Sequence, residues 1–258
     1  MGLGKSRAVV IGSFPIAESD RVVTFFSRDH GKVRGVARAA RRMRSRFGSA
    51  LELLTLGDLV FFDGGRSELV QVDHFDIVHP FERIRGDLHR LGHAAWIAEC
   101  IARLTADRDP NAAVYGLLVR ALRSVEAGGE PRRAATVFGL RCVDALGHRL
   151  RLDACVGCGR RPPAAATPAV IDVDEGGLTC SRCARRGHGS VRVDGSSLAV
   201  LRRLRILGWH EAMTAPLGRA EDQIRELVDL HVTALGGQAP RASRFLREVE
   251  RAFPEPRR

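Results

Sequence analysis

Four of the six cysteines form two C-x-x-C pairs, a spacing typical of metal ligands rather than of a disulfide. The first pair, "CVGC", is Cys155 and Cys158, and the second, "CSRC", is Cys180 and Cys183. Each pair lets two thiolates reach one ion from a tight turn, and two pairs complete a tetrahedral shell of four sulfurs. A closed shell leaves no position for water or substrate. The sequence therefore predicts one structural Zn²⁺ ion and no catalysis by the metal.

Two alternatives to a four-cysteine zinc site stay open. An iron–sulfur cluster also uses four thiolates, although the spacing favours zinc. His188 follows the second pair and could replace one cysteine. Cys100 and Cys142 lie in apolar helical segments, so we expect them to be buried packing residues.

A second group with chemical potential is the stretch "GKVRGVARAARRMRSRFG" from Gly31 to Gly48, which holds seven cations and no acid. Like charges this close repel one another, and ordinary surfaces intersperse acids among them. A polyanion would relieve the repulsion and release counterions, so the run predicts contact with nucleic-acid phosphates. The predicted contacts are Lys32, Arg34, Arg38, Arg41, Arg42, Arg44 and Arg46.

Strand alternation would place Lys32, Arg34 and Arg38 on one face, with Val36 rather than an aromatic residue between them. Such a face would contact phosphates more than bases, so we expect binding to be largely independent of sequence. Phe47 could stack on a base, but core packing is the more common fate of a phenylalanine. A plain solvated charge run and an anionic membrane patch are the competing interpretations; no amphipathic apolar face accompanies the run to support a membrane patch.

Composition agrees with an anionic partner. The 258 residues carry a formal net charge of +11, and 45 % of them are hydrophobic, as in a folded protein. No apolar run approaches the roughly 20 residues that span a bilayer, and no signal-peptide pattern begins the chain. We therefore expect a cytoplasmic protein that does not bind membranes.

The elements that must position these groups change along the chain. Residues 7–79 contain short β-branched and aromatic runs closed by turn residues, which predict about five strands. Val22–Ser27 and Lys32–Ala39 form one expected hairpin, and "DGG" at 63–65 turns another. Strands this short favour a small closed barrel, because closure removes exposed edges.

After Pro80, apolar residues recur at helical spacing, and three further amphipathic segments lie at Ser196–Leu207, Ala220–Leu235 and Arg241–Ala252. Residues 154–190 are instead rich in cysteine, glycine and proline. The predicted class is α+β, with an N-terminal domain at 1–80 and a helical domain at 81–258 that carries a zinc module at about 154–190.

Catalytic motifs are weak. "GLGKS" at 2–6 lacks the first glycine and the preceding strand of a phosphate-binding loop, and "GWHEAM" lacks the second histidine of a metalloprotease motif. No serine elbow or carboxylate pair stands out. The sequence thus favours a binding protein over an enzyme.

Several segments together resemble one family. They are "VVIGSFPIAESDRVVTFFSRDHGKVRGVARAARR", "SRFGSALELLTLGDLVFF", "ALGHRLRLDACVGCG", "EGGLTCSRC" and "APRASRFLREVE". In order and spacing they resemble the RecO proteins, recombination mediators of bacterial DNA repair. The resemblance implies an OB-fold barrel, a helical body and a zinc module. It also implies binding of single- and double-stranded DNA, strand annealing, and help in loading recombinase onto DNA coated by single-strand-binding protein.

The resemblance also implies partners, namely RecR and the acidic C-terminal tail of single-strand-binding protein, and it places the molecule at the nucleoid. "GKVRGVAR" is similar to the family's basic hairpin, which supports Lys32, Arg34 and Arg38 best. The remaining arginines fall in a loop that varies among members. Some members lack the cysteines. We expect a monomer when the protein is alone, and an RNA-binding accessory protein with a zinc ribbon and an OB-fold is the alternative.

Overall fold

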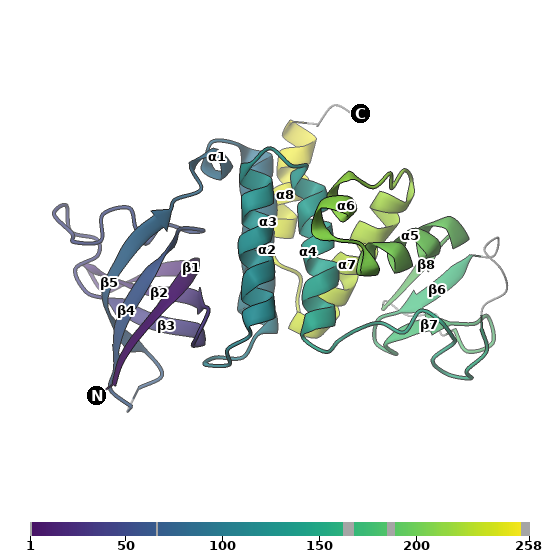
Figure 1. Ribbon diagram of the computed structural model, residues 1–258, viewed down its shortest axis with the longest axis horizontal. Helices are drawn as coiled ribbons and strands as arrows, with labels where there is room; N and C mark the ends of the chain where they lie inside the picture. The colour runs from purple at the N-terminus through teal and green to yellow at the C-terminus, as the bar shows by residue number, and fades with distance from the viewer. Residues whose placement is uncertain (1, 66, 162–167, 185–188, 254–258) are drawn as a thin grey trace. The chain divides into compact units, whose positions relative to one another are not determined.

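The computed structural model describes residues 2–65, 67–161, 168–184 and 189–253, and the chain forms two compact units (Figure 1). Unit 1 comprises Met1–Pro131 and Arg241–Arg258, and unit 2 comprises Arg132–Pro240. The predicted domain ranges, 1–80 and 81–258, instead follow the change from strands to helices, and they stay predictions. No helix in the described part of the chain is both long and apolar enough to cross a bilayer.

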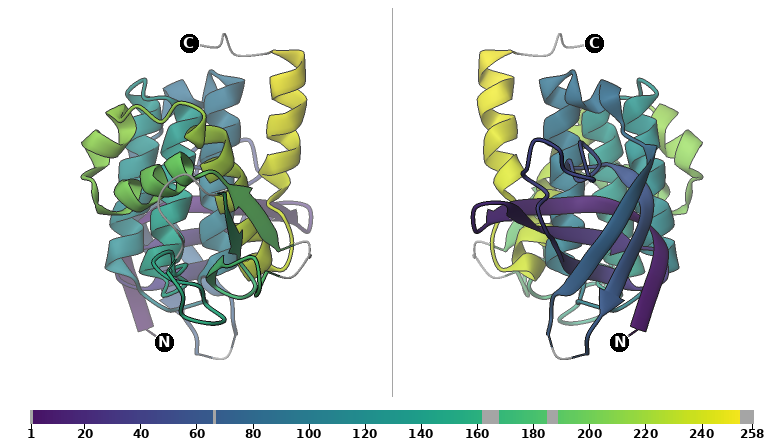
Figure 2. Two further views of the ribbon diagram at one scale, coloured as in Figure 1. Left: turned by 90° about the vertical axis from the view of Figure 1, so that its right-hand side faces the viewer. Right: turned by 90° about the vertical axis from the view of Figure 1, so that its left-hand side faces the viewer.

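Five strands of unit 1 close into a barrel in the order β1-β2-β3-β5-β4, and Figure 2 (right) looks onto it. The strands are β1 (Gly2–Ile16), β2 (Asp20–Ser27), β3 (Gly31–Ala37), β4 (Leu56–Asp63) and β5 (Val70–His79). Both predicted hairpins are present, because β2 pairs antiparallel with β3 and β4 with β5. Gly65 adopts φ 66° in the second turn, a conformation that glycine tolerates best. The predicted five-stranded OB-type barrel is confirmed.

The barrel interior is filled by inward-facing side chains and is closed at one end by the β3–β4 connection. Phe25 and Phe75 pack at 5.1 Å between ring centroids. Phe47 and Leu51 from the connection join the same buried cluster. Phe47 is only 4 % exposed, so core packing, the more common fate, is what the structure shows.

The long strand β1 changes face partway along. Val10 pairs with Phe25 and points inward, but the register with β2 shifts between Val10 and Gly12. Ser13 then pairs with inward-facing Val23, and Phe14 pairs with Val22 on the outer surface. A β-bulge of this kind reverses the side-chain alternation beyond it.

The described part of unit 1 also contains four helices. They are α1 (Glu82–Arg85), α2 (Leu88–Leu104), α3 (Ala112–Glu126) and α8 (Arg241–Ala252). Asp87 caps α2 by accepting from the Arg90 backbone N–H at 2.9 Å. Helix α2 packs on β1 and β2, and the ring of outward-facing Phe26 lies 6.5 Å from Tyr115 of α3. Phe25 and Phe26 are therefore both buried, on opposite sides of the barrel wall.

Unit 2 contains helices and a small sheet of order β7-β6-β8. Its elements are α4 (Pro131–Ala145), β6 (Ala169–Asp172), β7 (Gly177–Thr179), β8 (Ser190–Val193), α5 (Gly195–Ile206), α6 (Trp209–Thr214) and α7 (Ala220–Gly236). Helices α5, α7 and α8 match the three amphipathic segments, whereas the short helix α6 was not predicted. The expected class, a strand-rich barrel followed by helices with a cysteine-rich insertion, is confirmed.

Candidate nucleic-acid interface and metal centre

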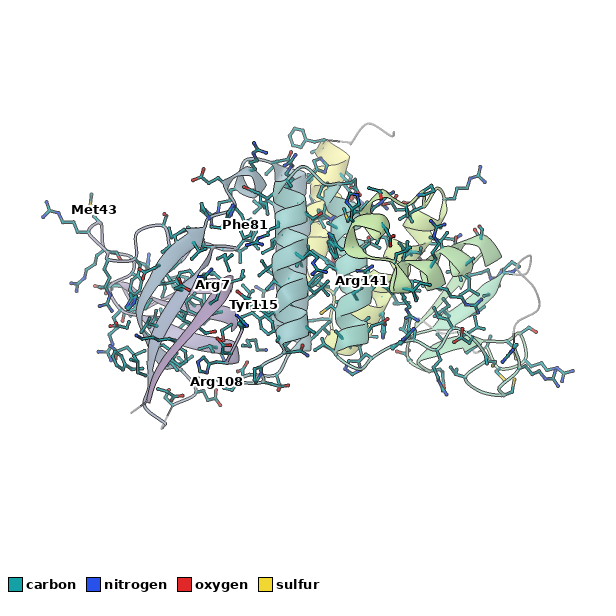
Figure 3. All side chains as sticks on the ribbon, in the orientation of Figure 1. Arg7, Met43, Phe81, Arg108, Tyr115 and Arg141 are labelled. Atoms are coloured by element: carbon teal, nitrogen blue, oxygen red, sulfur yellow. The ribbon has the colours of Figure 1, made fainter. Side chains whose placement is uncertain are left out.

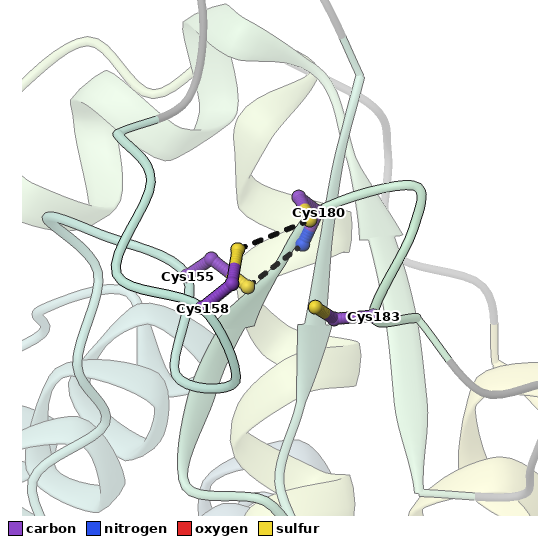
Figure 4. A group of neighbouring side chains, drawn as sticks. All are labelled: Cys155, Cys158, Cys180 and Cys183. Carbon is purple, nitrogen blue, oxygen red and sulfur yellow. Dashed lines mark hydrogen bonds between the residues drawn. The ribbon is translucent and has the colours of Figure 1, made fainter.

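The four cysteines of the two C-x-x-C pairs converge on one point (Figure 4). Cys155 and Cys158 lie in a turn that follows α4, and Cys180 directly follows β7. Their sulfurs and that of Cys183 all lie within 4.8 Å of one another, and the sulfurs of Cys158 and Cys180 are 3.7 Å apart. A tetrahedral ion with bonds of about 2.3 Å separates its sulfur ligands by about 3.8 Å. The arrangement therefore fits a four-thiolate metal ion.

The local backbone supports this convergence. The Cys180 backbone N–H donates to the Cys155 sulfur at 3.3 Å, as amides commonly do to metal-bound thiolates. A Cβ at Gly157 would lie 3.3 Å from both the Cβ and the sulfur of Cys183, so a larger residue there would crowd the second pair. Strands β6 and β7 form a β-turn-β piece that presents the second pair.

Two thiols differ sharply in acidity. Burial raises the pKa of Cys155, but backbone N–H groups of Cys180, Cys158 and Gly157 outweigh it and lower that pKa to about 6. Hydrogen bonds to the sulfurs of Cys180, Cys158 and Cys155 raise the pKa of Cys183 to about 12. Backbone N–H groups of Cys183 and Arg182 also lower the pKa of Cys180. The protein alone thus favours the thiolates of Cys155 and Cys180 and opposes that of Cys183, so a bound cation would be needed to keep all four ionised at neutral pH.

The other sulfur and histidine candidates are accounted for. Cys100 and Cys142 are buried, and burial raises the pKa of Cys142 to about 12, as expected for packing residues. His188, the alternative ligand, lies outside the described residues.

Five of the seven predicted cations lie together on the connection between β3 and β4, which we call the arginine loop, residues 38–46. All five side chains are exposed. They are Arg38, Arg41, Arg42, Arg44 and Arg46. The loop projects from the barrel, with fully exposed Met43 at its tip (Figure 3).

The arginine loop is fixed at its base to the β1–β2 turn. Asp20 accepts from the Ala39 backbone N–H at 2.8 Å, and this bond lowers the pKa of Asp20. The Arg41 backbone N–H donates to the Ser19 carbonyl at 2.9 Å. Asp20 is also the carboxylate whose charge interacts with Arg38 and Arg42. Among the described residues, no ion pair is formed by the five arginines, and Asp20 interacts with two of them, which leaves most of the positive charge available to a ligand.

Lys32, by contrast, faces the protein. Its ammonium donates to the carbonyls of Ala102 and Thr105 at 2.9 and 2.6 Å and lies 3.2 Å from Asp107. The side chain is only 13 % exposed.

The expected alternation holds for Lys32, Arg34 and Val36, because even-numbered residues of β3 point outward. Strand β3 ends at Ala37, however, before Arg38. Helix α2 covers the Lys32 end of the outer face. Lys32 therefore holds the barrel to the segment that ends α2, and it is not placed to contact phosphates.

Arg34 lies further along the same face and is half-exposed. It pairs across the strands with Thr24, and the next row joins Phe14, Val22 and Val36. Phe14 is 47 % exposed, and Ile16 beyond it is 41 % exposed. Sequence reasoning missed these two outward side chains, because regular alternation from Val10 places both inside the barrel. Only the β-bulge turns them out.

A hollow of about 540 Å³ between the barrel and α2 is also lined by arginines, and two of the three are paired with acids. Arg21 pairs with Glu52 at 3.3 Å, and Arg103 lies 3.8 Å from Glu99. Glu99 also accepts from the Arg241 backbone N–H at the start of α8. This hollow therefore offers less free positive charge than the arginine loop.

Comparison with known proteins covers nearly the whole chain. Residues 1–81 match the family described as Recombination protein O N terminal, and residues 85–243 match Recombination protein O C terminal. The chain belongs to the RecO family. A curated DNA repair protein RecO of Anaeromyxobacter dehalogenans is 35 % identical over 250 residues, which are 96 % of this chain and 98 % of the relative.

Two further RecO relatives extend the comparison. The DNA repair protein RecO of Geobacter sulfurreducens is 38 % identical over 184 residues, 71 % of this chain and 74 % of the relative. That of Listeria monocytogenes is 24 % identical over 250 residues, 96 % and 95 % of the two chains. The resemblance predicted from the sequence is confirmed, and both the barrel and the cysteine-rich segment lie within regions that match RecO.

Proposed function

We propose that this RecO family member is a non-enzymatic DNA-binding mediator of recombinational repair, and that it binds DNA through the arginine loop. The observation that carries the proposal is the set of five exposed arginines on a loop where Asp20 is the nearby carboxylate. Guanidinium groups release counterions when they bind phosphates, and this gain does not depend on base sequence. Single and double strands would both bind. Arg34, half-exposed on the adjoining face, would extend the contact.

Annealing follows from the same charge. Two complementary strands repel each other through their phosphates, and a loop that neutralises both lowers this repulsion until base pairing is complete. No bond is made or broken, so the chain needs no catalytic residue. Recombinase loading, with RecR and the acidic tail of single-strand-binding protein as partners, belongs to the same proposal and rests on family membership. An RNA-binding accessory role is not favoured, because both halves match RecO.

The metal in this proposal is one Zn²⁺ ion held by Cys155, Cys158, Cys180 and Cys183. Four sulfur ligands suit zinc and leave no open coordination position, so the ion would supply structure rather than reactivity. It would fix the turn after α4 to the end of β7. The protein would act in the cytoplasm at the nucleoid, as a monomer when alone.

Strand annealing tests the proposal. The variant carries Arg38→Ala, Arg42→Ala and Arg44→Ala, and the control carries Arg120→Ala and Arg123→Ala, which remove two exposed arginines from α3. We expect the loop variant to anneal complementary oligonucleotides about ten-fold more slowly or worse, because electrostatic attraction of this kind changes association rates by about 10- to 1000-fold. The control should anneal like the parent. Unchanged annealing and unchanged DNA affinity in the loop variant would reject the proposal.

A further inference from the structure

We infer that the β1–β2 hairpin adds a contact specific for single strands, in which Phe14 stacks on an unpaired base next to the arginine loop. The inference rests on the proposed function, since it names which form of DNA this surface prefers. It begins from the open face, which we define as Phe14 and Ile16 of β1 with Arg34 and Val36 of β3.

Strand register places these side chains together. Phe14, Val22 and Val36 form one row across the three strands, and Arg34 lies in the neighbouring row. Adjacent strands are about 4.8 Å apart and neighbouring rows about 6.6 Å apart, so the Phe14 ring and the Arg34 side chain start about 12 Å from each other. Both point away from the barrel interior.

The open face is exposed at its β1 edge, although Val22 in the middle of the row is buried. Phe26, on the same outer surface, is completely buried beside Tyr115, whereas Phe14 keeps 47 % of its surface exposed. Ile16, two residues along, is 41 % exposed on the same side. One exposed apolar residue needs no explanation, but two adjacent ones on a projecting hairpin mark a surface that binds something.

The positive charge of the neighbouring arginine loop favours a nucleic acid as the ligand of the open face. In the turn of this hairpin, the Ser19 carbonyl accepts a hydrogen bond from the Arg41 backbone N–H. The Ala17 carbonyl accepts one from the Arg41 guanidinium at 3.3 Å. The arginine loop therefore leaves the barrel beside the turn that follows Phe14 and Ile16. An aromatic ring flanked by cations matches a flexible strand, whose base can stack while its phosphates meet arginine. A base inside a duplex has both faces occupied and offers no such contact.

Binding of an oligothymidylate and of a matched duplex to the full chain tests this inference. Phe14→Ala should weaken single-strand binding about ten-fold, because stacking aromatics contribute this much or more per base, and should leave duplex affinity unchanged. Phe14→Trp should restore single-strand binding, and its fluorescence should be quenched by the bound base. Phe14→Leu keeps apolar volume without a ring face and should behave like Phe14→Ala. Phe253→Ala, which removes another exposed ring of unit 1, is the matched control.

The outcomes separate this inference from the function it extends. Unchanged single-strand affinity in Phe14→Ala, together with loss of binding in the Arg38, Arg42 and Arg44 variant, would overturn the stacking contact alone and leave the open face to a protein partner. Equal loss of single-strand and duplex binding in Phe14→Ala would also overturn it, because damage to the hairpin would then explain the result. If the arginine variant kept both single-strand and duplex binding, the proposed function itself would be rejected.

Discussion

The arginine loop and the cysteine-rich segment each gather side chains of one type, but those of the loop face solvent and those of the segment face one another. In the loop, five arginines are exposed, and Asp20 is a carboxylate near two of them. In the cysteine-rich segment, four sulfurs lie within 4.8 Å of one another. In the proposed function the loop offers its hydrogen-bond donors to an external polyanion, whereas the four sulfurs of the segment face one internal point. Clusters that look equally functional in a sequence can therefore serve binding in one case and folding in the other.

The same distinction divides the cation run itself. The Lys32 ammonium donates to two carbonyls and lies beside Asp107, whereas Arg38 of the same stretch is exposed. Proximity to helix α2 decides between these outcomes. A charged residue within a basic run contributes to binding only if no neighbouring element takes up its hydrogen bonds.

Metal removal should produce the largest effect and should be confined to one region. Structural zinc contributes apparent binding free energies of about 10–16 kcal/mol in small modules, so chelation or Cys180→Ser should abolish hydrogen-exchange protection in β6 and β7. Strands β2 and β3, which enclose an apolar core, should keep their protection. DNA affinity should remain the same, because the arginine loop belongs to a separate compact unit.

A cysteine outside the cluster provides the control for metal removal. Cys100→Ala should retain one zinc ion per chain by metal analysis, and Cys180→Ser should lose it. Purified protein without stoichiometric zinc, or strands β6 and β7 that stay protected after chelation, would show that the four thiols do not depend on a metal.

Exchanging Lys32 should have a smaller effect, on stability rather than on binding. Lys32→Met leaves the carbonyls of Ala102 and Thr105 without their donor, and buried acceptors of this kind cost about 1–3 kcal/mol. Arg38→Ala, at an exposed position, should change stability by no more than about 0.5 kcal/mol. Urea unfolding compares the two variants. A Lys32→Met protein with parental stability and weakened DNA binding would place Lys32 in the interface after all.

Much of the fold was predictable because each local pattern had one physical solution. The "DGG" turn and the alternating runs on either side of it specified the β4–β5 hairpin, and apolar spacing specified α5, α7 and α8 to within about one residue. The short helix α6 was not predicted. Six residues give too little periodicity to distinguish a helix from a turn.

The candidate sites were predictable where residue spacing alone determines the geometry, and less so where tertiary packing determines which way a side chain points. Two C-x-x-C pairs define their own geometry, so the convergence of the cysteines needed no tertiary information. The orientation of Phe14 depends on a bulge between Val10 and Gly12, and the residue types there do not predict a bulge. The burial of Lys32 depends on its hydrogen bonds to Ala102 and Thr105, some 70 residues away in the chain.

The salt dependence of single-strand binding tests most directly whether the arginine loop holds phosphates. Each phosphate contact contributes about −0.7 to the slope of log affinity against log salt on single strands. Removing Arg38, Arg42 and Arg44 together should make the slope less negative by about 2. Between about 50 and about 200 mM salt the parent should then lose roughly 20-fold more affinity than the variant. Parallel slopes for the two proteins would contradict the account.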